Sequence, residues 1–178
     1  MYYNNNSKDY DYYGQVSPNM PTSDTTRTQP QSDGIFTYPQ NLQNALNEIS
    51  EALAGEADDR LFYAWLLGMT SSFEDRDIII GIRDDEKDHF TLFNQLFYEL
   101  TGMMSSQVQR KQFVSPESYC EGLARALQGE QNAVKKYRKI LYAMQDRVHI
   151  NIMTEIITDE IRHGILYSYL YAKNACKD

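Results

Sequence analysis

The chain has 178 residues, enough for one domain with a real core, and its 17 Lys and Arg against 25 Asp and Glu give a net charge of −8. This charge argues against nucleic acid and anionic membranes as partners, and no apolar run reaches the roughly 20 residues that span a bilayer. The N-terminus has neither a basic head nor an apolar signal core, so we expect a cytoplasmic protein.

Residues 1–36 are rich in Asn, Ser, Thr, Gln, Pro and Tyr and poor in aliphatic side chains. Ordering such a segment costs entropy that no buried core would offset. We therefore expect a disordered Tyr- and Asn-rich tail over residues 1–36 and a folded domain over residues 37–178. The tyrosines of the tail also permit an adhesive or cross-linkable role.

The first two helices are predicted from apolar residues that recur at three-and-four spacing. The first should run from about residue 39 to 68, with Glu56 on its apolar stripe. The second should start near residue 72, where Ser71 and Glu74 have capping-box spacing, and end at Gly102. Its apolar stripe contains a Glu-x-x-His motif at 86–89.

Two more helices follow, and they set the expected fold class. The third should open near the Ser115-Pro116 pair and carries Glu130 on its apolar stripe; the fourth carries Glu160 and His163. The connections within each helix pair are short, whereas residues 101–114 are long enough to cross the length of a bundle. We expect an all-α four-helix bundle built from two repeated helical hairpins joined by a long crossover.

The two hairpins carry the same pattern, 74 residues apart. ALAGE at 52–56 aligns with ALQGE at 126–130, and DEKDH at 85–89 aligns with DEIRH at 159–163. The shift superimposes acid on acid and imidazole on imidazole inside the apolar stripes. The pairs are Glu56 with Glu130, Glu86 with Glu160, and His89 with His163.

These six side chains predict a dinuclear metal site. Two hairpins related by a pseudo-twofold axis would bring them to one level, where four ionised carboxylates without partners would cost several kcal/mol each. Two divalent cations balance that charge, and the neutral imidazoles complete the ligand set. Asp85 and Asp159 are expected to orient the histidine of the opposite hairpin. The alternative is a metal-free bundle with a buried polar network.

Other residues have weaker signals. Tyr63 and Tyr137 lie two turns beyond the helical glutamates, where their hydroxyls could bond the ligands or pass an electron, or serve only as core fillers. The third histidine, His149, is expected at the surface or in packing. Counting helical rise leaves Cys120 and Cys176 about 9 Å apart in height, so no disulfide is expected and a reducing compartment fits.

The motifs ALAGE, DEKDH, ALQGE and DEIRH, with Tyr63 and Tyr137, resemble the ferritin-like superfamily and its rubrerythrin-like branch over about residues 39–175. The resemblance implies a site with two iron ions that reacts with dioxygen or hydrogen peroxide, by ferroxidase or peroxide-reducing chemistry. It implies that Glu56 and Glu130 are the helical carboxylates and that Glu86 and Glu160 are bridging or chelating ligands. His89 and His163 would be the terminal imidazole ligands.

Two departures from that family matter. The chain has no paired Cys-x-x-Cys iron module, so an electron donor would be a separate protein, and Ala133 stands where rubrerythrins carry an extra glutamate. The ligand set also suits a catalase-like dimanganese enzyme. Non-enzymatic iron sequestration and a structural role are further alternatives, the last because the tail resembles those of some spore-coat proteins. A homodimer is expected.

Overall fold

A computed structural model describes residues 36, 38, 40–105 and 113–177 of the chain, and for residues 56–59 it describes the backbone only. The predicted tail, residues 1–36, lies outside this part except for Phe36. The described residues form four helices and no strand, which confirms the all-helical prediction. The helices are α1 (Leu42–Met69), α2 (Phe73–Thr101), α3 (Tyr119–Tyr142) and α4 (Arg147–Lys173).

The helix ends follow from local hydrogen bonding. Helix α2 begins after Ser72, one residue later than predicted, and the Ser72 hydroxyl accepts from the Asp75 N–H at 3.3 Å. It ends at Gly102, as predicted, in a left-handed conformation with φ 70°. Helix α3 begins after Ser118 rather than near Ser115, because Ser118 accepts from the Glu121 N–H at 3.1 Å and caps the helix there.

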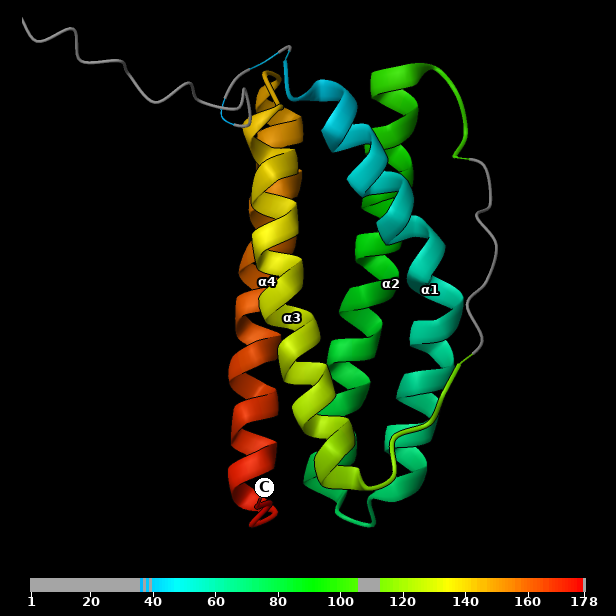
Figure 1. Ribbon diagram of the computed structural model, residues 1–178, viewed down its shortest axis with the longest axis vertical. Coiled ribbons are helices and arrows are strands. Elements are labelled where there is room, and N and C mark those ends of the chain that lie inside the picture. Colours follow the sequence, from blue (N-terminus) through cyan, green and yellow to red (C-terminus); the bar gives the residue numbers. More distant parts are fainter. Residues whose placement is uncertain (1–35, 37, 39, 106–112, 178) are drawn as a thin grey trace, which may run out of the picture. The chain divides into compact units, whose positions relative to one another are not determined.

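The four helices pack as a square in which every neighbouring pair is antiparallel. Helices α1 and α2 are neighbours, as are α3 and α4, α1 and α3, and α2 and α4. Figure 1 shows α1 and α4 running downwards and α2 and α3 running upwards. The chain therefore leaves α2 at one end of the helices and enters α3 at the other. Because neighbouring helices run in opposite directions, their dipoles are antiparallel, which is the favourable arrangement.

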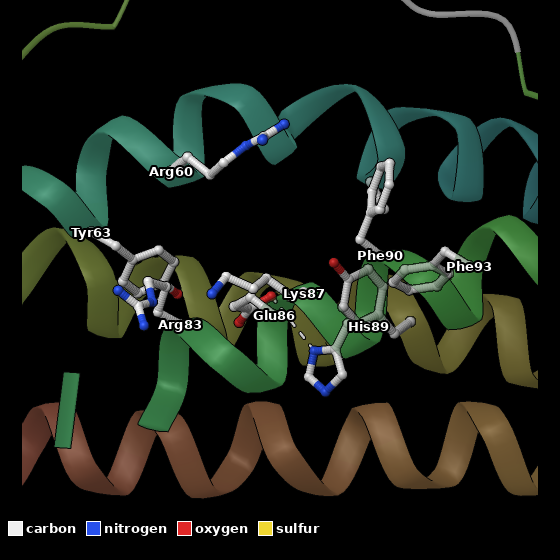
Figure 2. A pocket seen from close by; sticks show the side chains of 10 residues that line it. Arg60, Tyr63, Arg83, Glu86, Lys87, His89, Phe90 and Phe93 are labelled. Atoms are coloured by element: carbon white, nitrogen blue, oxygen red, sulfur yellow. Dashed lines mark ion pairs between the residues drawn. The ribbon is translucent and has the colours of Figure 1, made fainter. Parts of the chain in front are cut away.

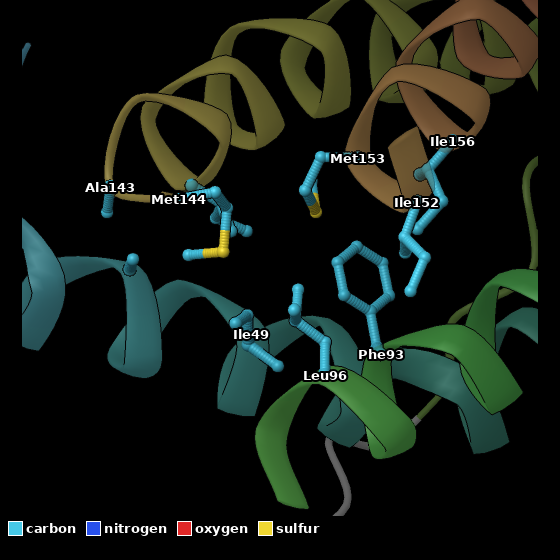
Figure 3. Packing of buried hydrophobic residues seen from close by; sticks show 10 residues of the cluster. Ile49, Phe93, Leu96, Ala143, Met144, Ile152, Met153 and Ile156 are labelled. Atoms are coloured by element: carbon cyan, nitrogen blue, oxygen red, sulfur yellow. The ribbon is translucent and has the colours of Figure 1, made fainter. Parts of the chain in front are cut away.

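Two apolar clusters fill the space between the helices and leave a polar level between them. Figure 3 shows the first cluster, in which Ile49 of α1, Leu96 of α2 and Met153 of α4 are fully buried. The second lies towards the other end and includes Leu66 and Leu170, which are also fully buried. Along α2 and α4, the segment between the clusters is where the predicted acids and imidazoles lie.

Cys120 and Cys176 form a disulfide, which corrects the prediction that they lie too far apart. Their Cα atoms are separated by 5.5 Å. The prediction extended α4 in a straight line to Cys176, but α4 ends at Lys173 and the chain turns back. Ala175 takes φ 49°, and the Cys176 N–H donates to the carbonyl of Tyr171 at 3.2 Å. The disulfide also removes the argument for a reducing compartment, since disulfides persist in oxidising surroundings.

Candidate metal centre

The folded chain brings four of the predicted ligand residues into one group, and His89 lies outside that group but close to two of its members, Glu86 and Glu160. The side-chain ligand atoms of Glu86, Glu130, Glu160 and His163 all lie within 4.8 Å of one another, so this group could hold a metal ion. They come from three helices, α2, α3 and α4. Glu56 lies on α1, but its side chain is outside the described part of the chain.

Both imidazoles aim Nδ1 at the carboxylates. His163 Nδ1 lies 3.3 Å from Glu86 Oε1 and 3.9 Å from Glu130 Oε2. His89 Nδ1 lies 3.2 Å from Glu160 Oε1 and 3.5 Å from Glu86 Oε2. None of these contacts has hydrogen-bond geometry, and both Nδ1 atoms and Glu160 Oε1 are buried without a hydrogen-bond partner among the described residues. Buried polar atoms are rarely left this way, so the cluster needs a further partner.

The other imidazole nitrogens face the two aspartates of the opposite hairpins. His89 Nε2 lies 3.3 Å from Asp159 Oδ2, and His163 Nε2 lies 3.1 Å from Asp85 Oδ2. A carboxylate at Nε2 accepts a hydrogen bond from the Nε2–H group, so Nδ1 is the nitrogen that can act as a metal ligand once it has lost its proton. The structure therefore contains both cross-hairpin contacts that the sequence suggested.

Arg162 is a residue that the sequence analysis missed. Its Nη2 donates to Asp85 at 2.8 Å and to Asp159 at 2.7 Å, so one guanidinium joins the two aspartates behind the imidazoles. The signal that could have found it is its place in DEIRH, three residues after Asp159, where a helix puts both side chains on one face. Its counterpart in the repeat is Asp88, so the contact exists in one hairpin only.

The cluster also determines the protonation of its members. Burial alone would lower the pKa of His89, but the carboxylates of Glu160 and Glu86 outweigh it and raise that pKa to about 10. The pKa of His163 is likewise raised, because Glu86 and Asp85 outweigh its burial. Burial alone would raise the pKa of Glu86, but His163 and His89 lower it to about 2. Without metal, His89 is thus protonated at neutral pH and its charge offsets part of the charge of the acids.

Three tyrosines lie next to the cluster, one more than predicted. Tyr63 is 6% exposed, and burial followed by the charges of its neighbours raises its pKa. Tyr137 is half-buried, and its ring lies 4.9 Å from that of Phe93. Tyr167 is fully buried, and its hydroxyl has no hydrogen-bond partner among the described residues. Tyr167 was not singled out from the sequence, and its counterpart in the repeat is Phe93.

A small cavity opens beside the cluster between α1 and α2. Figure 2 looks into this space of about 50 Å³, with Arg60 and Tyr63 reaching it from α1 and Glu86 and His89 from α2; the dashed line joins the last two. A larger pocket of about 400 Å³ reaches Glu86 from the side of α1 and α3. Small molecules can therefore approach the cluster from outside the helices.

His149 does not belong to the site. Its Nε2 lies 2.7 Å from Glu99 Oε2, which agrees with the predicted role in packing or at the surface. No helix in the described part of the chain has the length and apolarity to cross a membrane.

Comparison with known proteins adds one relative. The chain is similar to the uncharacterized protein YhjR of Bacillus subtilis (strain 168), with 28% identity over 129 residues that cover 72% of this chain and 83% of that protein. No family model matches the sequence. No solved structure matches it either. The functional argument therefore depends on the geometry of the cluster.

Proposed function

We propose that this chain binds two metal ions, most simply iron, and acts as an oxidoreductase of the ferritin-like, rubrerythrin-like type. One observation carries the proposal: Nδ1 of His89 and Nδ1 of His163 are buried against carboxylates at 3.2 and 3.3 Å without forming hydrogen bonds. A metal ion bound between a nitrogen and carboxylate oxygens supplies the missing partner. Imidazole with carboxylate is a donor set suited to iron and manganese.

The contacts support a division of the ligands between two ions. Glu86 would help to hold both ions, because its Oε2 faces His89 and its Oε1 faces His163. Glu160 would do the same by the repeat symmetry, and its Oε1 already approaches His89 of the other hairpin. Glu130 would complete the ion next to His163, and its repeat counterpart Glu56 the ion next to His89.

Charge supports the same stoichiometry. Four ionised carboxylates carry −4, whereas the two imidazoles could supply no more than +2 even with both protonated, which leaves a net negative charge in a largely buried cluster. Two divalent cations supply +4 and release the imidazole protons. The ions therefore balance the cluster better than protons do.

Bound iron would supply one-electron redox chemistry towards dioxygen or hydrogen peroxide, which makes a ferroxidase or a peroxide reductase the proposed activity. The chain's own residues would hold and orient the reactants. Asp85 and Asp159 would fix the imidazole rings, with Arg162 holding both aspartates in place. Tyr63 would keep its proton near neutral pH, because its pKa is raised, and could donate a hydrogen bond to a ligand carboxylate. Electrons for turnover would come from a separate donor protein.

The test is metal content and a peroxide reaction in the same preparations. We expect about two ions per wild-type chain, and an absorbance change when the anaerobic protein is mixed with Fe(II) and then with hydrogen peroxide or dioxygen. Glu130→Ala should remove the change and at least one ion. Glu155→Ala is the control, because Glu155 is exposed on α4. A folded wild-type protein that takes up neither iron nor manganese would contradict the proposal.

The alternatives differ in simple observables. A dimanganese enzyme would contain manganese after native expression and would evolve dioxygen from hydrogen peroxide. Iron sequestration would require an assembly far larger than a dimer, which sedimentation detects. A structural coat protein would lose assembly when residues 1–36 are deleted while keeping its metal content.

A further inference from the structure

The larger pocket beside the cluster is far bigger than dioxygen or peroxide requires. It measures about 400 Å³, and Glu86, Glu130 and Glu160 of the cluster are among the residues that line it. A water molecule occupies only about 30 Å³ in the liquid, and the two oxidants are of similar size. Pockets of about 300–1,000 Å³ are typical of sites for small organic molecules. The volume therefore points to an organic ligand.

The walls of this pocket combine aromatic side chains with small residues. Phe62 and Tyr63 line it from α1, and Phe113 from the segment that precedes α3. The wall from α3 contains Gly129 and Ala133, and a Cβ added at Gly129 would meet no atom within 4 Å. Small residues opposite aromatic rings leave a slot into which an apolar body, such as a second ring, can fit.

The pocket is lined by charges of both signs. Arg125 is the one cation among the described residues that line it, and its Nη1 donates to the Val114 carbonyl at 2.8 Å. Its guanidinium lies 5.7 Å from the centre of the Phe62 ring, so Arg125 is held between the 113–118 segment and α1. A guanidinium held in this way binds carboxylates well.

We propose that this pocket binds a small organic acid with an aromatic or similar apolar body. The carboxylate lies at Arg125, the body packs against Phe62 and Tyr63 over Gly129, and the far end reaches the metal centre. The preference for an acid rests on the proposed function, because only ions at the cluster remove the negative charge of the glutamates at the pocket's inner end. Without them, a ligand with an amine would be favoured.

The experiment titrates 3-phenylpropionate into the metal-loaded protein by calorimetry and compares two glycine variants. Gly129→Leu fills the slot and should weaken binding at least about tenfold. Gly81→Leu is the matched control, since Gly81 is also an exposed helical glycine whose added Cβ meets nothing within 4 Å, but it lies outside the pocket. Leucine favours helix over glycine, so both variants should fold.

The charge assignment needs its own comparison. Arg125→Gln should weaken 3-phenylpropionate about threefold to fivefold at low ionic strength, because the contact is exposed, and should leave 3-phenylpropanol unchanged. Tighter binding of 3-phenylpropylamine than of 3-phenylpropionate to the metal-loaded protein would overturn the assignment to acids. Equal binding by wild type and Gly129→Leu, or no binding at all, would overturn the pocket as a site.

Metal analysis of each preparation separates this inference from the proposed function. Two ions with no probe bound would overturn the pocket and leave the metal centre standing. Probe binding that depends on Gly129 in a protein that takes up no metal would overturn the metal centre. In that case the acid preference would fail with it, and the amine probe should bind more tightly.

Discussion

Two sites with buried carboxylates in this protein differ in how their charge is balanced. At the end of the helices, Asp75 of α2 is fully buried, and Lys173 Nζ donates to it at 2.6 Å. Asn174 Nδ2 donates to it at 2.9 Å and the Tyr119 hydroxyl at 3.1 Å. Burial alone would raise the pKa of Asp75, but these partners, led by Lys173, lower it to about 2. The chain itself therefore supplies every partner that this carboxylate needs.

The central cluster contains more acid and is not closed in this way. His89 and His163 approach its carboxylates, yet their Nδ1 atoms and Glu160 Oε1 form no hydrogen bond among the described residues. This contrast distinguishes a structural carboxylate from a metal ligand. A structural carboxylate is saturated by donors of the chain, whereas a ligand set keeps its ligand atoms directed at a common point.

Among the tests of this difference, metal loading should produce the largest change in the free energy of unfolding. At a free metal concentration about a thousand times Kd, a bound ion should raise the free energy of unfolding by about 4 kcal/mol, since the unfolded chain lacks the site. Urea unfolding followed by circular dichroism, with and without Fe(II) under anaerobic conditions, measures this. His163→Ala should lose most of the increment. An equal unfolding midpoint with and without metal would show that the central cluster is as self-sufficient as Asp75.

Removing the charge of Asp75 should destabilise the fold without affecting metal. Asp75→Asn keeps the shape but loses charge-assisted hydrogen bonds, so the free energy of unfolding should fall by about 2 kcal/mol. The same urea titration measures it, and the metal content should stay at the wild-type value. A loss of bound metal in this variant would mean that the two clusters are coupled and that the distinction drawn between them is wrong.

The aspartates behind the imidazoles should give a smaller change, in affinity rather than stability. Asp85→Asn and Asp159→Asn should each weaken metal binding about tenfold or more, because the imidazole loses the carboxylate that orients it. Competition with a chelator measures the affinity. Asp84→Asn is the control, since Asp84 is exposed and pairs with Arg83 and Lys87. Equal affinities for all three variants would refute the orienting role.

The smallest signal is the release of protons on metal binding. The folded pKa of His89 is about 10, above the ordinary value of 6.5, and the pKa of His163 is raised as well. At pH 8, loading should therefore release the proton of His89, measured in weakly buffered solution. The raised pKa of His89 also predicts how the stability of the metal-free protein depends on pH. The contribution of His89 to the free energy of unfolding is present below pH 6.5 and is lost as the pH rises through about 10. Stability of the metal-free protein that rose over this range would contradict the assignment.

Much of the fold could be read from the sequence because its signals are local or repeated. Helix periodicity and the Gly102 cap depend on neighbouring residues only, and the structure has both the predicted helix and its end at Gly102. The 74-residue repeat pointed to His89, Glu130 and the other cluster members, since two copies of one hairpin bring equivalent positions to one level. Spacing within a helix was sufficient to predict which side chains share a face.

Only the tertiary structure decided the contacts that depend on chain direction and on close approach between distant segments. The turn after Lys173 brings Cys176 back to Cys120, which a count of helical rise could not foresee. The role of Arg162 and the closure of the network around Asp75 likewise need residues that are far apart in sequence. Such contacts form because helix packing fixes the distances between side chains, and no periodicity in the sequence encodes those distances.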